Sequence, residues 1–436
     1  MFKTLANAWK IPELRKKLMF TMLVLLVYRL ASAIPVPYID TSALTQAFQY
    51  GELGGTILGL YNVMSGSALS QASVLALGIQ PYINASIIIQ LLTVAIPALE
   101  RMAKDEGEIG KKKIERITRY STVAIGLLLG FAYFTMCKSY GFLTTDANSF
   151  LPAVVIILAF TAGSTIVMWM GEQITEFGIG NGISMILFAN IIAGLPSGIA
   201  SLVTMGKSYW WLPIAIVVGM AALIVFIVFI NDAERRIPIQ YAKRVVGRKI
   251  YGGQNTNLPI KVAMSGVMPV IFAQSICTIP ATIFTFYFSA NGITANSAGL
   301  YDNVWYDYIF SPNCWTYFAF YVLMIFFFSW FYSTIQYDPV EVANNLKKNG
   351  GFIPGFRPGK PTADFVQKVI NKIVIFGAVY LAVVAGLPIV AGNLMPQNMN
   401  LAIGGTSVII VVGVALETVK ALEAQMLMRH YKGFLD

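Results

Sequence analysis

The chain has 436 residues, of which 56% are hydrophobic and only 12% are charged, and its net charge at pH 7 is +10. Soluble domains carry roughly a quarter of charged residues, so this composition excludes an ordinary soluble protein and indicates that lipid surrounds most side chains. The only histidine, His430, lies near the C-terminus, which excludes a histidine-based catalytic triad and a zinc site with several histidine ligands.

Ten apolar runs long enough to cross a bilayer follow one another along the chain. A hydrocarbon core takes about 20 residues of helix. The predicted spans are 18–34, 72–96, 120–137, 151–170, 183–203, 212–230, 262–288, 315–335, 369–391 and 401–422. We therefore expect an all-α polytopic membrane protein with about ten transmembrane helices.

The basic residues lie mostly on one side of these spans. All but four of the 31 Lys and Arg residues fall at the two termini or in the even-numbered connections; the exceptions are Arg29, Lys138, Lys207 and Lys372. The positive-inside rule then predicts that both termini and the large basic loops are cytoplasmic. The first apolar run lacks the small-residue cleavage site of a signal peptide, so we expect no cleaved leader.

Two of the cytoplasmic connections, 232–261 and 337–368, are each about thirty residues long, and loops of this length tend to be functional. The first of them mixes basic residues with Tyr241 and Tyr251. This pattern suits a large acidic partner, RNA or protein, and it suits anionic lipid headgroups equally well.

Charged residues are almost missing from the predicted spans, and Arg29, near the outer end of the first, is expected to snorkel. An ion-coupled transporter needs charged groups at mid-depth, and an intramembrane enzyme needs a catalytic dyad or metal cluster. Neither can be assembled here. Neutral polar residues do occur within spans, and their simplest interpretation is helix-to-helix hydrogen bonding; they are Asn84, Ser86, Gln90, Asn190, Gln274 and Ser275.

The stretch 54–73 (GGTILGLYNVMSGSALSQAS) is moderately apolar, rich in glycine and serine, and too short to cross a membrane. It is either a re-entrant segment, which needs a cavity inside the protein, or an amphipathic helix resting on the outer surface. Composition alone slightly favours the surface helix.

Nucleotide and cofactor motifs fail on inspection. Residues 354–361 have prolines where a phosphate-binding loop needs its first glycine and its Ser or Thr. Residues 178–182 lack the third glycine of a dinucleotide fingerprint. We expect no cofactor and no energy source in this chain.

Several strings along the chain, taken together, resemble the SecY family. They are MWMGEQITEFGIGNGIS at 168–184, RRIPIQYAKR at 235–244, NLKKNGGFIPGFRPGKPT at 345–362 and GGTSVIIVV at 404–412, with further matches at 66–92 and 257–273. The resemblance covers essentially the whole chain and is highly specific. This family forms the central subunit of the protein-conducting channel (translocon), with SecE and usually SecG as partners.

The resemblance implies two pseudo-symmetric inverted halves, 1–201 and 212–436, joined by a hinge at 202–211 and enclosing a central hourglass pore. It also implies that 54–73 is the re-entrant plug helix that fills the outer funnel at rest, which overrides the surface-helix preference. The implied plug residues are Thr56, Ile57, Leu58, Leu60, Tyr61, Asn62, Met64 and Ser67.

The family's constriction maps onto six aliphatic residues, which we call the pore ring: Ile79, Ile83, Ile183, Leu187, Ile271 and Ile410. Leu187 stands where isoleucine is commoner, a volume-conserving change. The second and seventh spans are implied to form the lateral gate through which a signal sequence reaches lipid, and the gate residues are Ser86, Ile87, Gln90, Gln274 and Ser275.

The two long cytoplasmic loops match those that dock the motor ATPase SecA and the ribosome. The implied contact residues are Arg235, Arg236, Lys243, Arg244, Arg248, Lys347, Lys348, Arg357 and Lys360. Of these, Arg357 falls on the position that motor-driven translocation needs. Phe177 replaces a basic residue common in relatives, which leaves the fourth connection without Lys or Arg.

The implied function is a passive pore, without catalytic activity, for unfolded secretory polypeptides across the bacterial cytoplasmic membrane, with lateral release of membrane-protein helices. SecA or the translating ribosome drives it. Signal sequences and nascent polypeptides are its expected ligands, anionic lipids surround it, and YidC is a further candidate partner.

Overall fold

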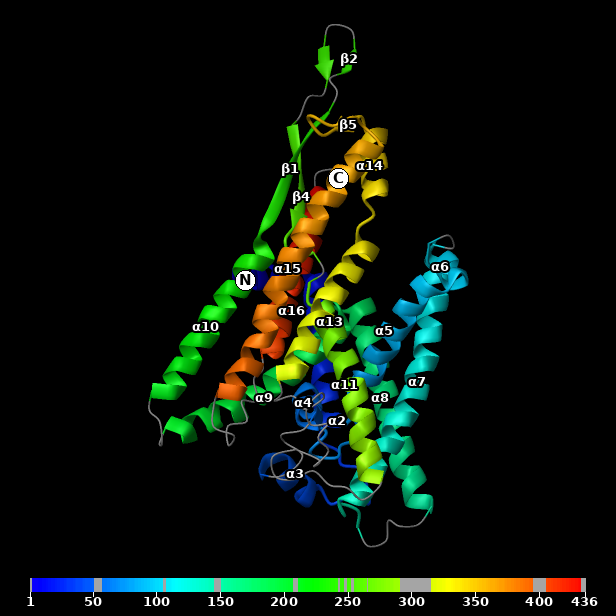
Figure 1. Cartoon of the computed structure of the whole chain (residues 1–436), viewed down its shortest axis with the longest axis vertical. Coiled ribbons are helices and arrows are strands. Elements are labelled where there is room, and N and C mark those ends of the chain that lie inside the picture. The colour runs from blue at the N-terminus through cyan, green and yellow to red at the C-terminus, as the bar shows by residue number, and fades with distance from the viewer. Residues whose placement is uncertain are drawn as a thin grey trace.

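The computed structural model describes residues 2–50, 57–104, 107–144, 150–206, 211–241, 244–246, 249–251, 255–264, 266–290, 315–394 and 405–432. Figure 1 shows helices over most of the chain. They are α1 (Phe2–Lys10), α2 (Pro12–Ala31), α3 (Thr41–Tyr50), α4 (Ile57–Met64), α5 (Gln80–Ala95), α6 (Pro97–Lys104), α7 (Gly107–Ser139), α8 (Phe150–Phe177), α9 (Gly182–Gly206), α10 (Trp211–Asp232), α11 (Met268–Ala290), α13 (Trp315–Gln336), α14 (Pro339–Lys348), α15 (Lys360–Leu394) and α16 (Gly405–Lys432).

Each of the ten predicted spans overlaps a helix in the part of the chain that the structure describes: α2, α5, α7, α8, α9, α10, α11, α13, α15 and α16. By length and apolar composition, five of the described helices could cross a membrane, or six if the bent pair α5 and α6 counts as one span. α2 is not among these candidate spans, and its first turns carry three basic residues, Arg15, Lys16 and Lys17. The predicted all-α, multi-span fold is confirmed.

The prediction for the start of the second span was wrong. Residues 72–79 form successive turns, and the helix begins only at Gln80. Ala72 and Gly78 have positive φ angles of 44° and 53°, a conformation incompatible with a right-handed helix. Pro81 then occupies the first turn of α5, where its missing N–H leaves no bond unmade. Hydropathy does not report backbone conformation, so the apolar run concealed this boundary.

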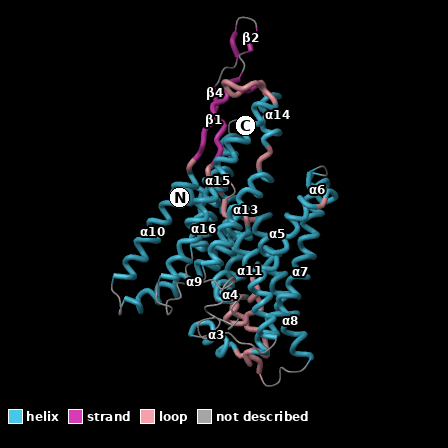
Figure 2. The backbone as a smooth tube through the Cα atoms, viewed as in Figure 1, coloured by secondary structure: helices cyan, strands magenta, loops and turns pink. Residues whose placement is uncertain are grey.

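The predicted basic connections gather at one end of the molecule (Figure 1). The strands, α14 and α6 lie at that end, and α3 and α4 lie toward the opposite one. All the strands in the described part of the chain lie at the first end (Figure 2). α1 packs against α16. The long basic connections therefore share one end of the molecule.

The two long connections form one sheet, which the sequence analysis had treated as separate loops. β1 (Glu234–Tyr241) pairs antiparallel with β4 (Asn255–Lys261), and its last residues pair with β5 (Gly351–Phe352), giving the order β4-β1-β5. β2 (Arg244–Val246) and β3 (Lys249–Tyr251) form a separate two-stranded ribbon at the tip. A small apolar cluster lies at the base of the sheet: Ile237, Ile260, Met264, Ile353, Val366 and Ile370.

Proline fits this sheet because β5 covers only one end of β1. Pro238 lies opposite Asn257 of β4, whereas β5 reaches only Gln240 and Tyr241. Pro238 has no N–H to donate, so it belongs where one side of the strand is an open edge. The pairing of β5 with the end of β1 also attaches the loop 337–368 to the loop 232–261.

α8 lies very close to the segment that follows α4, and this contact fixes the irregular segment inside the molecule. A Cβ added to Gly163 of α8 would overlap the carbonyl group of Val74. Val74 is itself held by its N–H, which donates to the carbonyl of Ile34 at 2.9 Å. Only glycine fits at position 163, because its neighbour is backbone, which cannot rotate away.

We predict that Gly163→Ala destabilises the folded protein by about 1–3 kcal/mol, the usual effect of overpacking. Thermal unfolding in detergent should show a lower Tm than the wild type. Gly219→Ala on α10 is the matched control, because an added Cβ there meets nothing within 4 Å. Equal Tm values for Gly163→Ala and the wild type would contradict the close approach.

Candidate functional site

The six predicted pore-ring residues fall within or beside one large apolar cluster inside the helix bundle. They belong to α5, α9, α11 and α16, with Ile79 as the residue just before α5. Ile79, Ile83, Leu187, Ile271 and Ile410 are between 1% and 6% exposed and share one buried cluster, against which the partly buried Ile183 packs. All four helices therefore contribute aliphatic side chains to this cluster.

The start of α9 sets the positions of two of these residues, Ile183 and Leu187. Gly180, with φ of 72°, turns the chain after α8. The carboxamide oxygen of Asn181 then accepts the Ile183 N–H at 3.0 Å, which caps the new helix. Ile183 and Leu187 follow at i and i+4, so they lie on one helix face.

The short helix α4 lies inside the bundle, so the surface-helix interpretation of this segment was wrong. α4 contacts α9 and α11. Leu58 is 3% exposed, and the Tyr61 hydroxyl donates to Thr278 Oγ1 at 3.2 Å on α11. Composition could not reveal this, because the partners of α4 come from helices far away in the sequence.

The turn after α4 is held by hydrogen bonds to Asn62, near the end of that helix. Asn62 Oδ1 accepts the N–H of Ser70 at 2.9 Å, and the carbonyl of Asn62 accepts the N–H of Ser67 at 2.8 Å. Ser67 has a φ of 68°. Among the other predicted plug residues, Thr56 lies outside the described part, and only the backbone of Ile57 and Leu60 is described.

Four side chains from four helices donate hydrogen bonds to the end of α4 and the turn after it. Asn190 Nδ2 donates to the Met64 carbonyl at 2.9 Å, and Arg29 Nη1 donates to the Gly66 carbonyl at 3.1 Å. Gln80 Nε2 and Gln274 Nε2 lie 3.2 and 3.5 Å from Met64 Sδ. Arg29 was expected to snorkel toward the membrane surface. In the structure its guanidinium group instead donates a hydrogen bond to this turn.

The sequence analysis missed this donor cluster, although the sequence carries a pattern that points to it. Asn190 and Gln274 stand three residues after Leu187 and Ile271 of the pore ring, so each lies one helical turn away on a similar face. Gln80 directly follows Ile79. Amides that repeatedly flank ring positions indicate a polar layer beside the apolar one.

The predicted gate residues lie on α5 and α11, which contact each other. Ile87, Gln274 and Ser275 are buried, and Ser86 and Gln90 are half-buried. α11 also packs against α7, which the sequence analysis did not consider. The Tyr133 hydroxyl of α7 donates to the Leu69 carbonyl at 2.8 Å.

A small cavity of about 30 Å³ lies beside α4. Nonpolar atoms make up most of its surface, and its lining includes Leu58, Tyr61, Leu69, Ala76, Leu77, Gln80, Leu129, Tyr133 and Thr282. It lies between α4, α5, α7 and α11, so the packing of α4 against the predicted gate is incomplete.

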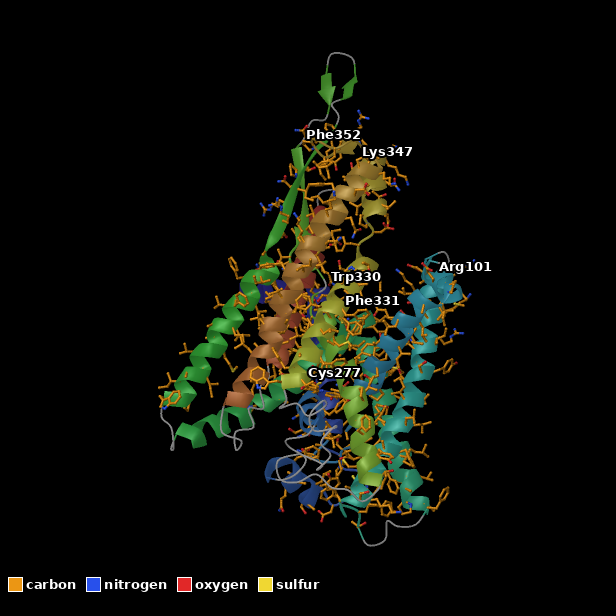
Figure 3. All side chains as sticks on the ribbon, viewed as in Figure 1. Arg101, Cys277, Trp330, Phe331, Lys347 and Phe352 are labelled. Carbon is orange, nitrogen blue, oxygen red and sulfur yellow. The ribbon has the colours of Figure 1, made fainter. Side chains whose placement is uncertain are left out.

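The predicted basic contact residues lie on the sheet and its surroundings. Arg235 and Arg236 are exposed on β1, and Arg236 Nε lies 3.8 Å from Glu234 Oε2. Figure 3 shows Lys347 beside Phe352, near the junction of α14 and β5. Lys348 ends α14, and Lys360 begins α15.

Arg357 is exposed in the short connection between β5 and α15. Its carbonyl accepts the Thr362 hydroxyl at 2.8 Å, which fixes the backbone while the guanidinium stays free to reach a partner. Arg244 is described only as backbone, in β2, and Lys243 and Arg248 lie outside the described residues.

A helical multi-span protein with a short helix held inside its bundle has the architecture of a membrane channel. The SecY family model matches residues 73–419. Protein translocase subunit SecY of Streptomyces scabiei is 42% identical over 446 residues, and that of Mycobacterium bovis is 40% identical over 454, each covering 100% of both chains. The chain belongs to the SecY family.

Solved structures agree on the fold. The structure of a protein conducting channel gives a TM-score of 0.64 at 18% identity and covers 96% of both chains. Sec61 in the canine ribosome-channel complex from the endoplasmic reticulum gives 0.59 at 18% identity, again over 96% of both chains.

We predict that the double substitution Ile83→Gly and Ile183→Gly raises the resting ion conductance of the purified protein in planar bilayers at least severalfold. Removing branched side chains from a narrow apolar passage leaves room for water, and a hydrated passage lets ions cross. The matched control is Ile214→Gly with Ile224→Gly on α10, both exposed, which should leave the baseline current unchanged. An unchanged current in the ring variant would contradict the role of the pore ring.

Proposed function

We propose that this chain is the channel-forming subunit of a protein translocase, without catalytic activity of its own. One observation carries the proposal: aliphatic residues from four helices converge in one buried cluster while a separate short helix lies inside the bundle against two of those four helices. The relatives of 40–43% identity are themselves named as translocase subunits.

The pore ring suits a passage that must reject ions and accept any polypeptide. Aliphatic groups offer an ion no replacement for its hydration shell, and a narrow apolar constriction excludes water. The same groups make no hydrogen bonds that demand a particular partner. They therefore close around an extended chain of any sequence.

Opening follows from a population shift driven by the passenger. A signal sequence that leaves the pore between α5 and α11 gains on the order of 0.8 kcal/mol for each buried methylene. A dozen apolar residues thus supply enough free energy to separate two helices held partly by polar contacts. The plug, residues 54–73, then leaves the funnel.

The two pseudo-symmetric halves, 1–201 and 212–436, are part of the same proposal. α7 packs against α5 and α8 in the first half, and α13 packs against α11 and α15 in the second. The halves meet where α9 contacts α16 and where α11 contacts α5 and α7. Residues 207–210 of the proposed hinge lie outside the described part.

The basic sheet is proposed to face the cytoplasm and to dock what drives the polypeptide, the SecA motor or the translating ribosome. The solved structures of two distantly related channels, canine Sec61 and yeast Ssh1, are complexes with ribosomes. Guanidinium groups suit RNA phosphates and acidic side chains. Both termini then lie in the cytoplasm of a bacterium, with SecE, SecG, YidC and anionic lipids as membrane partners.

The proposed function is tested with proteoliposomes that contain this chain, SecE, SecA and ATP. A preprotein with a signal sequence should become protected from protease in the lumen. Protection in liposomes that lack this chain, or none in those that contain it, would contradict the proposal.

We predict that Arg357→Glu lowers SecA-driven export in these vesicles by at least tenfold. The substitution replaces a cation that attracts an acidic partner with an anion that repels it. Membrane insertion and thermal stability should stay normal, since the side chain is exposed. Arg101→Glu is the control, an exposed arginine on α6 at the same end of the molecule but away from the sheet (Figure 3). Normal export by Arg357→Glu would refute the assigned role.

A further inference from the structure

The donor cluster around α4 divides into two parts with different geometry. Asn190 of α9 and Arg29 of α2 donate to main-chain carbonyls, at Met64 and Gly66. Gln80 at the start of α5 and Gln274 of α11 donate to the same side-chain atom, Met64 Sδ. The thioether of Met64 therefore joins α5 to α11.

These two glutamines have little else to bind. Gln80 is 8% exposed and Gln274 is 6% exposed. Among the residues that the structure describes, neither carboxamide oxygen has a hydrogen-bond partner, although both oxygens are buried. A thioether is only a weak acceptor, yet leaving a buried N–H unpaired is unfavourable. Met64 is thus the group that satisfies one donor on each of two helices.

We propose that Met64 is a positioning residue that couples the plug to the lateral gate. This inference rests on the proposed function, which makes α5 and α11 the gate. When the two helices separate, the sulfur cannot stay within reach of both amides, so the plug loses a contact. When the plug leaves, both amides lose their acceptor, so the closed gate is weakened in turn. Such coupling is reciprocal.

The remaining contacts make Met64 separable from the rest of the plug. The bonds from Asn190 and Arg29 go to main-chain carbonyls, and a substitution of the Met64 side chain leaves both acceptors in place. Met64→Leu therefore removes the shared acceptor with little change in volume. Met64→Gln has a similar length and returns an acceptor oxygen to the same place.

The experiment compares these two variants with the wild type in the proteoliposomes described above. Two quantities are measured: the resting ion leak, and the export of a preprotein whose signal sequence has a shortened apolar segment. Met64→Leu should raise both by roughly tenfold, because two donors lose their acceptor. Met64→Gln should return both toward the wild-type values. Met168→Leu, a buried methionine on α8, is the matched control and should change neither.

A leak from Met64→Leu equal to that of the wild type would overturn the proposal. So would a Met64→Gln variant as leaky as Met64→Leu, because packing rather than hydrogen bonding would then explain the effect. Elution of each variant as a single species establishes that it has folded.

A double-mutant cycle isolates the bridge. If Met64 acts through Gln274, the variant with both Met64→Leu and Gln274→Leu should leak no more than the leakier single variant. Leaks that multiply would overturn the coupling. If the wild-type vesicles export no preprotein, the proposed function is wrong, whereas the leak measurements still decide the role of Met64.

Discussion

The fold depends on closing a hole in a membrane with contacts that can be broken and remade. Packing among aliphatic side chains meets this requirement, because dispersion and the exclusion of water hold them together without fixed partners. Ile83, Leu187, Ile271 and Ile410 are almost fully buried in one apolar cluster. They come from four different helices, α5, α9, α11 and α16.

Polar contacts have the complementary role of giving the closed state one geometry. An apolar cluster alone permits many arrangements of a short helix such as α4. Hydrogen bonds from Asn190, Arg29, Gln80 and Gln274 select one of them. Few of these groups are charged, so releasing them requires far less free energy than breaking buried ion pairs. If α4 is the plug, as proposed, it must leave and return, and contacts of this modest strength allow that.

Much of this could be predicted from the sequence, and what could not shares one physical cause. Each of the ten apolar runs found by hydropathy overlaps a helix in the described part of the chain, because membrane helices need long apolar runs. Hydropathy misplaced the start of the second one, where Ala72 and Gly78 adopt positive φ angles within an apolar stretch. The pairing of Tyr241 with Gly351 was also missed, because strand pairing across more than a hundred residues leaves no local pattern.

The site shows the same division. Isoleucines four residues apart, as at 79 and 83, are ordinary in lipid-facing helices, so only the resemblance to a family pointed to a ring. The interior position of α4 contradicted the composition, because its partners, such as Thr278, come from distant helices. The bridge through Met64 was invisible for the same reason. A sequence shows which groups can donate and accept, whereas the fold decides which of them meet.

The direction of the hydrogen bonds around α4 adds a final constraint on how the channel works. The four side chains that reach residues 64–66 all donate, and this turn supplies acceptors. Main-chain carbonyls are acceptors that every polypeptide carries, whatever its side chains. Under the proposed function, a chain that enters after the plug has left brings the same acceptors past the same donors. The polar layer would then tolerate any passenger sequence, as the proposed apolar ring would, but by offering bonds that every backbone can accept.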